Sequence, residues 1–228
     1  MTESMPKGLE GRAMDLQKKL IPELIEFCKP YFISEEEAKE FVLTCEKHEN
    51  PLFKRALHQL QRHINLSNDM EKIQKEKDTF QVFFWIVAIE AIFKASTKHS
   101  KKQKAEIIRE FFKNYISQED QCLLMSRVKK NNNSVEHTTI EIVADMLNVV
   151  RNLFAHEGIY WMFSFPQNEG EQTLNILPKE KTTFLSTYTM GTENMDTYLV
   201  FITKQEVQNI IVKGAINFIK DNLQKHNE

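Results

Sequence analysis

The chain has 228 residues, of which 41% are hydrophobic and 27% charged, a balance typical of a globular protein and not of a disordered or membrane-embedded one. The formal net charge is −2, so a nucleic-acid partner would have to be held by a local basic patch. No glycine-, serine- or proline-rich stretch separates two parts of the chain. We therefore expect a single domain over residues 1–228.

The N-terminal residues 1–15 lack the basic-then-apolar pattern of a signal peptide, and no apolar run is long enough for a membrane span. This indicates a cytoplasmic protein without a membrane partner. The three cysteines, Cys28, Cys45 and Cys122, are widely spaced and contain no C-x-x-C pair. They are predicted to be small buried thiols in a reducing compartment.

Helix start signals recur along the chain and predict a mainly α fold. Ser34 with Glu37, and Thr203 with Glu206, match the capping-box pattern, and Asn50 precedes a proline at the first helical position. The apolar run FQVFFWIVAIEAIF predicts a buried central helix. The expected helices cover residues 15–27, 34–48, 50–66, 67–96, 101–115, 117–130, 138–155 and 203–225.

After Gly158, the expected C-terminal cap of helix 138–155, the sequence changes character. The segments IYWMFSF, TLNIL, TTFLSTYTM and TYLVFI are typical of short strands, and turns are expected at 168–170 and near Gly191. These features predict a small β-strand or hairpin insert over residues 159–202. The C-terminal helix over 203–225 follows it.

The segment VVRNLFAHEG places Arg151, Asn152 and His156 at the end of helix 138–155. It resembles the HEPN superfamily, whose ribonuclease members carry an arginine, a polar residue that is often asparagine, a few more residues and then a histidine. The resemblance implies a HEPN-like helical bundle in which these three residues are catalytic. It also implies a HEPN-type endoribonuclease of a toxin or defence kind, with an antitoxin protein as a possible partner.

A helical wheel gives the expected orientation of these side chains. With Val150 at the centre of the apolar stripe, Arg151 lies at about 100°, Asn152 at about 200° and His156 at about 240°. All three are therefore expected to face away from the core, with the Asn152 amide able to contact the His156 imidazole. This outward face suggests a symmetric homodimer, and HEPN ribonucleases typically dimerise through this helix.

The residue types fit metal-independent cleavage of RNA. Imidazole can take a proton from the ribose 2′-hydroxyl near neutral pH, and a guanidinium can hold the charge that builds on phosphate oxygens. Attack by the 2′-hydroxyl would leave a 2′,3′-cyclic phosphate, and DNA would not be cut. No metal ligands are found at a convincing spacing around His156, and no cofactor is expected.

Two acidic residues and a basic run are further candidates. Glu90, a carboxylate inside the apolar central helix, either orients Arg151 or has only a structural role, as an ion pair or as a partly exposed carboxylate. Glu157 adjoins His156 and is a second candidate for a supporting role. The basic run is a candidate for RNA contacts, although it is also typical of a solvated loop. Its lysines are Lys98, Lys101, Lys102 and Lys104.

Two other functions stay open at this point. One is a non-catalytic HEPN-like module that binds RNA, a nucleotide or a partner protein and uses the polar face of the helix for assembly only. The other is a helical scaffold in which the motif is a coincidence. The intact set of Arg151, Asn152 and His156 favours the ribonuclease over both.

Overall fold

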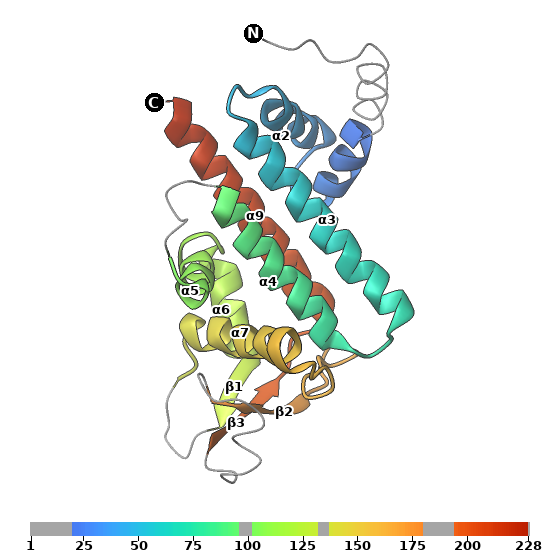
Figure 1. The fold of residues 1–228 in the computed structure, drawn as a ribbon, viewed down its shortest axis with the longest axis vertical. Coiled ribbons are helices and arrows are strands. Elements are labelled where there is room, and N and C mark those ends of the chain that lie inside the picture. Colours follow the sequence, from blue (N-terminus) through green and yellow to red (C-terminus); the bar gives the residue numbers. More distant parts are fainter. Residues whose placement is uncertain (1–19, 96–101, 132–136, 180–193, 228) are drawn as a thin grey trace.

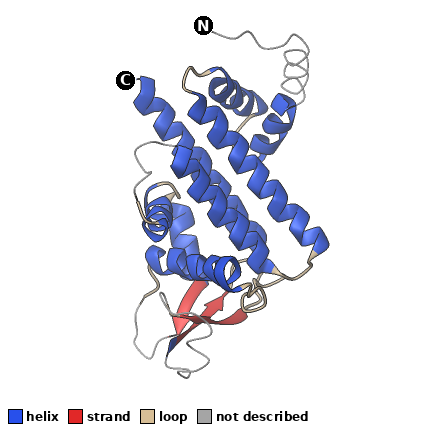
Figure 2. Cartoon of the chain, in the orientation of Figure 1, coloured by secondary structure: helices blue, strands red, loops and turns tan. Residues whose placement is uncertain are grey.

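A computed structural model describes residues 20–95, 102–131, 137–179 and 194–227. The fold is mainly helical with one small sheet, as the sequence predicts (Figures 1 and 2). Residues 20–28 are helical and lead into a short 3-10 helix. The elements that follow are η1 (Lys29–Tyr31), α2 (Glu35–Lys47), α3 (Pro51–Ile73), α4 (Asp78–Ala95), α5 (Lys104–Asn114), α6 (Gln118–Arg127), β1 (Val128–Asn131), α7 (Ile140–Glu157), β2 (Thr173–Pro178), β3 (Met195–Val200) and α9 (Lys204–Asn227).

Three long helices, α3, α4 and α9, run side by side and form the body of the molecule (Figure 1). α2 packs on α3 at one end of this body. At the other end α7 crosses α4, with α5 beside it, and the sheet lies beyond α7 (Figure 2). α7 is therefore held between the helical body and the sheet.

α4 is the central helix that the apolar run predicts. It contacts α3, α5, α7 and α9, and this surrounding explains why its sequence is apolar on nearly every side. The Trp85 indole N–H donates to Oε1 of Gln208 on α9 at 3.2 Å, which satisfies a buried donor. None of the described helices is both long and apolar enough to span a membrane.

Side chains cap the helices where the sequence places them. The Ser34 hydroxyl accepts from the N–H of Glu37, and Asn50 Oδ1 accepts from the N–H of Leu52. At the start of α9 the N–H of Glu206 donates to the Thr203 hydroxyl, while the N–H of Thr203 donates to the Glu206 carboxylate. These contacts confirm the predicted caps at Ser34 and Asn50 and the capping box at Thr203, whereas at Ser34 the second bond of the predicted box is not formed.

The expected helix over 67–96 is wrong, because the chain reverses between α3 and α4. Glu76 in this turn has φ 60°, a left-handed conformation that interrupts the helix. α3 therefore extends past the expected boundary at Leu66, and α4 folds back along it. The reversal buries the apolar face of α4 against α3, which a straight helix could not do.

The sheet contains one strand that the sequence did not predict. Its order is β1-β3-β2, and both pairs are antiparallel. β1 occupies residues expected to end the helix over 117–130, because α6 stops at Arg127 and Val128 then pairs with Val200. TLNIL and TYLVFI supply β2 and β3 as predicted, whereas TTFLSTYTM and the turn near Gly191 lie outside the described residues.

The segment IYWMFSF, residues 159–165, is not a strand. Its side chains Ile159, Phe163 and Phe165 are buried in the core, but the N–H groups of Ser164 and Phe165 donate to side chains and not to the backbone of a strand. The N–H of Ser164 donates to Oδ1 of Asn175 at 2.8 Å, and the N–H of Phe165 donates to Oδ2 of Asp78 at 2.7 Å. Buried polar side chains thus replace the partners that a strand would need.

Candidate functional site

The C-terminal turn of α7 carries the three motif residues. Gly158 ends the helix in a left-handed conformation with φ 67°, as the sequence predicts, and its N–H donates to the carbonyl of Phe154 at 3.1 Å. The N–H of Ile159 donates to the carbonyl of Leu153, also at 3.1 Å. These bonds fix the end of α7 directly beside His156.

Arg151 lies inside the protein, with 5% of its surface exposed. Its Nη2 lies 2.9 Å from Oε1 of Glu90 on α4, and its Nη1 donates to Oδ1 of Asn152 at 2.9 Å. The expectation that all three motif residues face away from the core is therefore wrong for Arg151. The residue sits at the edge of the apolar stripe, and α4 packs against α7 closely enough for the guanidinium to reach Glu90.

Three buried polar atoms at this place lack a hydrogen-bond partner among the described residues. They are Nε of Arg151, Oε1 of Glu90 and Oδ1 of Asn148. The contact between Arg151 and Glu90 is thus a close ion pair without the geometry of a directed hydrogen bond. Asn148 lies one turn before Arg151 on α7. Such uncompensated groups are rare in protein interiors, and functional sites are one of the places that retain them.

His156 is exposed, and within the described part of the chain no hydrogen bond reaches its ring. The predicted contact between the Asn152 amide and His156 is absent, and Oδ1 of Asn152 instead accepts from Arg151. Helix geometry separates Arg151 and His156 by roughly 7.5 Å along the axis and roughly 140° around it. His156 is therefore free to contact a substrate, whereas Arg151 is enclosed between α7 and α4.

The two acidic candidates, Glu90 and Glu157, lie close to the motif residues. Glu90 is buried, and besides Arg151 its second carboxylate oxygen lies 3.8 Å from Nζ of Lys94. Orienting Arg151 and forming a structural ion pair both require Glu90 to contact a cation. The contacts of Glu90 with Arg151 and Lys94 are therefore compatible with either role. Glu157 is half-buried at the last position of α7, next to His156.

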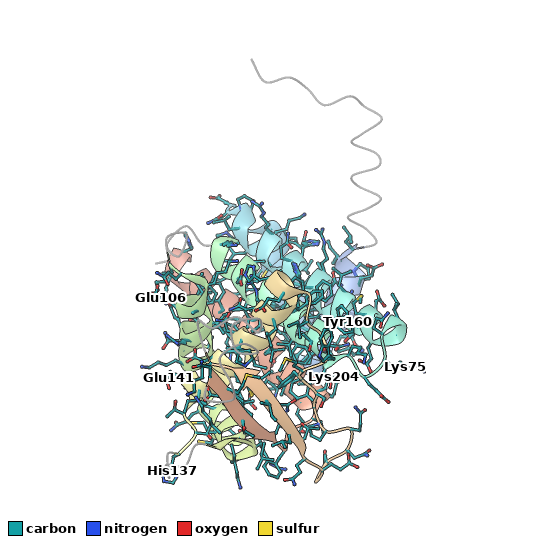
Figure 3. All side chains as sticks on the ribbon, turned by 60° about the horizontal axis from the view of Figure 1, so that its bottom comes forward. Lys75, Glu106, His137, Glu141, Tyr160 and Lys204 are labelled. Atoms are coloured by element: carbon teal, nitrogen blue, oxygen red, sulfur yellow. The ribbon has the colours of Figure 1, made fainter. Side chains whose placement is uncertain are left out.

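The basic run does not join the motif in the described structure. Lys98 and Lys101 lie outside the described residues. Lys102 pairs with Glu110 on α5, and Lys104 is exposed at the first position of that helix. In Figure 3 Glu106, near the start of α5, and Tyr160, just beyond the end of α7, lie on opposite sides of the molecule.

The segment after α7 is held in place by a buried polar network. The Asp78 carboxylate accepts from the N–H of Phe165 and from Nζ of Lys204, the latter at 3.1 Å. Lys204 also pairs with Glu71 at 2.8 Å, and Gln81 donates to the same Glu71. Burial alone would lower the pKa of Lys204, but its bonds to Glu71 and Asp78 outweigh burial and raise that pKa.

A chain of aromatic rings runs from α7 to the surface. Phe154 meets Phe80 edge to face at 4.9 Å, Phe80 stacks on Tyr160 at 5.5 Å, and Tyr160 meets Trp161 at 5.3 Å. Of the aromatic rings in the run FQVFFWIVAIEAIF, which predicts a buried helix, Trp85 and Phe93 are buried, whereas Phe80, Phe83 and Phe84 are half-buried. The sequence interpretation missed Tyr160 and Trp161 because it placed them in a strand.

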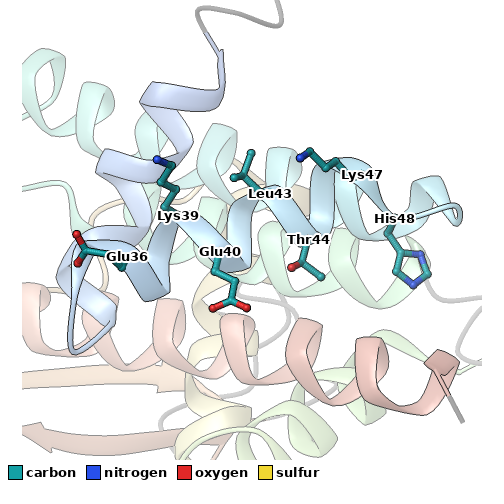
Figure 4. Close-up of a pocket in the computed structure, with 7 residues that line it drawn as sticks. All are labelled: Glu36, Lys39, Glu40, Leu43, Thr44, Lys47 and His48. Carbon is teal, nitrogen blue, oxygen red and sulfur yellow. The ribbon is translucent and has the colours of Figure 1, made fainter.

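Two hollows of the described surface lie away from the end of α7. A shallow hollow of about 580 Å³ runs along α2 and is lined by the exposed residues Glu36, Lys39, Glu40 and Lys47 (Figure 4). A smaller apolar pocket of about 190 Å³ lies between the start of α3 and the end of α9. Within the described ranges, no three His, Cys, Asp or Glu side chains come together as metal ligands would.

Comparisons with known protein families, with curated proteins and with solved structures gave no match to this chain.

Proposed function

We propose that this chain is a metal-independent endoribonuclease of the HEPN type, with Arg151, Asn152 and His156 as its active site. The substrate is RNA, and the role is that of a cytoplasmic toxin or defence protein that a partner protein neutralises. The observation that carries the proposal is the group at the end of α7. On α7 an exposed imidazole follows, by five residues, a buried guanidinium that contacts a carboxylate and an amide, and three buried polar atoms around that guanidinium lack a hydrogen-bond partner among the described residues.

In the proposed reaction His156 takes the proton from a ribose 2′-hydroxyl. The 2′-oxygen then bonds to the neighbouring phosphorus, the bond from phosphorus to the 5′-oxygen breaks, and a protonated group returns a proton to that oxygen. The products are a 2′,3′-cyclic phosphate and a 5′-hydroxyl. The positive charge of Arg151 offsets the negative charge that builds on the phosphate oxygens in the transition state.

Arg151 is enclosed in the single chain, and the proposal therefore requires its guanidinium to move. Phosphate competes with Glu90 for the guanidinium, and both offer the paired oxygens that arginine binds best. Nε, which has no partner in the described structure, is the atom that gains most from this exchange. Glu90 thus holds the guanidinium in one position until RNA binds.

A homodimer through α7 is part of this proposal. Two copies related by a twofold axis would bring two His156 side chains to one cleft, so that one takes the proton and the other returns it. The half-buried face of α4 next to the motif, with Phe83 and Phe84, offers apolar surface for the same contact. A second copy would also enclose the substrate and exclude water from Arg151.

A second candidate is a non-catalytic HEPN-like module that binds RNA, a nucleotide or a partner protein. The burial of Arg151 favours it, because an arginine paired with a buried glutamate also serves the packing of α4 against α7 without any chemistry. In this case His156 would be an exposed residue of an assembly surface.

The deciding experiment incubates wild type, His156→Ala and His137→Ala with structured and single-stranded RNA in EDTA. His137 is another exposed histidine and is the matched control. We expect wild type and H137A to leave cyclic-phosphate ends, and H156A to lose at least roughly a hundredfold in rate. Cleavage by H156A at the wild-type rate would remove the proposed active site. Three folded proteins that cut no RNA would favour the non-catalytic module.

A further inference from the structure

Two aromatic side chains are exposed directly after the turn that carries His156. Trp161 is 60% exposed and Tyr160 is 37% exposed. Tryptophan is among the more buried residue types on average, so an open indole next to a candidate active site calls for a ligand. The chain between His156 and Trp161 spans at most about 17 Å, which keeps both within reach of one short stretch of nucleic acid.

The two rings are anchored from both sides. Tyr160 stacks on Phe80 of α4 with an angle of 28° between the rings, and Trp161 meets the edge of Tyr160 at 82°. On the far side the buried Phe163 and Phe165 hold the segment, and Asp78 binds its backbone. Binding a ligand would therefore cost little ordering of these rings.

The surroundings favour a ligand with flat faces and negative charge. The indole of Trp161 offers an exposed π surface. The Tyr160 ring, stacked on Phe80, supports it, and Nζ of Lys77 lies 5.9 Å from the centre of the Tyr160 ring. Lys75 follows α3 on the same side of the molecule as Tyr160 (Figure 3). Unpaired nucleotides have this combination, because their bases expose both faces and their phosphates are anionic. Bases in a duplex are already stacked on each other, so their faces are not available to the two rings.

We propose that Tyr160 and Trp161 form a stacking platform for unpaired RNA bases, and that the platform selects single-stranded segments for the site at His156. This inference rests on the proposed ribonuclease function and adds the substrate class to it. The platform acts by binding, so its test does not depend on cleavage.

The first test uses the fluorescence of the two tryptophans in the His156→Ala background, which removes the candidate base. Trp85→Phe leaves Trp161 as the single indole of the chain, and Trp161→Phe leaves Trp85, which is fully buried. We expect a single-stranded adenosine oligonucleotide to quench Trp161 and to leave Trp85 unchanged. The matching duplex and a ribose-phosphate strand without bases should quench neither.

The second test measures affinity by fluorescence anisotropy with a labelled single-stranded RNA, and it does not require the Trp85 substitution. In the same background Trp161→Ala should weaken binding roughly tenfold. Leu174→Ala is the matched control, because Leu174 is equally exposed, at 61%, on β2. This control variant should bind as tightly as its parent.

Three outcomes separate the possibilities. Trp161-dependent binding without any cleavage by the wild type would keep the platform and reject the ribonuclease. Cleavage by the wild type combined with unchanged RNA affinity in the Trp161→Ala variant would reject the platform alone. Shielding of Trp161 that rises with protein concentration in the absence of RNA would also overturn it, because the rings would then be an interface between two copies.

Discussion

Nη2 of Arg151 lies 2.9 Å from Oε1 of Glu90, and each side chain is 6% exposed. The arginine of the candidate motif is therefore tied to the central helix of the fold. Any substitution at either position changes the stability of the protein as well as its proposed active site. Activity measurements on these residues need a stability measurement beside them.

Removing one partner of this pair should destabilise the fold strongly. Glu90→Met leaves a buried guanidinium without its counter-ion, and we expect a loss of about 3–5 kcal/mol in the free energy of unfolding. Replacing both residues in Glu90→Met/Arg151→Met should recover most of this loss, because no charge is then buried alone. Urea denaturation followed by circular dichroism measures both. Lys94→Met, which removes an exposed partner of Glu90, is the control and should cost less than about 1 kcal/mol. Equal losses for Glu90→Met and Lys94→Met would contradict the assignment of Arg151 as the main partner of Glu90.

Asp78 should control the segment that follows α7. Asp78→Ala removes the acceptor of the Phe165 N–H and a partner of Lys204, and we expect a loss of about 2–3 kcal/mol. Hydrogen exchange at residues 163–165 should accelerate more than exchange in α4. Glu71→Ala, which removes a more exposed partner of Lys204, is the control and should have a smaller effect. Unchanged exchange in D78A would mean that the segment is held by its apolar side chains alone.

The cysteines should respond differently to a thiol reagent. Cys122 is exposed, whereas Cys28 and Cys45 are buried, and burial raises the pKa of both buried thiols to about 12. A disulfide reagent that releases a coloured product should therefore modify one of the three thiols in the native protein. In denaturant the same reagent should modify all three. Rapid modification of all three thiols under native conditions would show that the part of the core around Cys28 and Cys45 opens easily.

The same thiols predict a dependence of stability on pH. Their pKa is raised in the folded state, so their contribution to stability is complete below the ordinary thiol pKa of about 9 and is lost as the pH rises toward about 12. The free energy of unfolding should fall between these values. Replacing Cys28 and Cys45 by alanine should flatten this fall, even though the double variant is less stable at pH 7. An equal slope with and without the thiols would contradict the prediction.

Gly158 should set the end of α7. An added Cβ meets no atom within 4 Å, so the cost of Gly158→Ala comes from the backbone conformation alone, and we expect about 1–2 kcal/mol. Gly158→Asn should cost less, because asparagine adopts the left-handed conformation more readily. Thermal unfolding compares the two. Equal stability of the alanine variant and wild type would show that the helix end tolerates another conformation.

The helical fold was predictable where local sequence decides the structure. Ser34, Asn50 and Thr203 cap helices because their side-chain oxygens lie within a few residues of the backbone groups they bind. The end of α7 at Gly158 is also decided locally, because glycine adopts the left-handed conformation readily. The predicted turn at 168–170 is also present, with Gly170 at φ 85°.

Features decided by distant contacts were not predictable in this way. The reversal between α3 and α4 depends on burying α4, and β1 exists only because β3, far along the chain, pairs with it. Arg151 points inward because Glu90 of another helix draws it there, which a wheel of α7 alone cannot show. The sequence did single out Glu90 as a carboxylate that needs a partner, and this was the available signal for the pair.

The order β1-β3-β2 has a consequence for synthesis of the protein on the ribosome. β1 precedes α7 and β2 follows it, yet both pair only with β3, which is made some forty residues after α7 ends. Until β3 emerges, the two strands that flank α7 have no partner among the described residues. A chain cut short before residue 195 should therefore keep α7 packed on α4 and α5, with Arg151 paired to Glu90, but leave β1 and β2 unpaired, so the sheet forms only when translation is nearly finished.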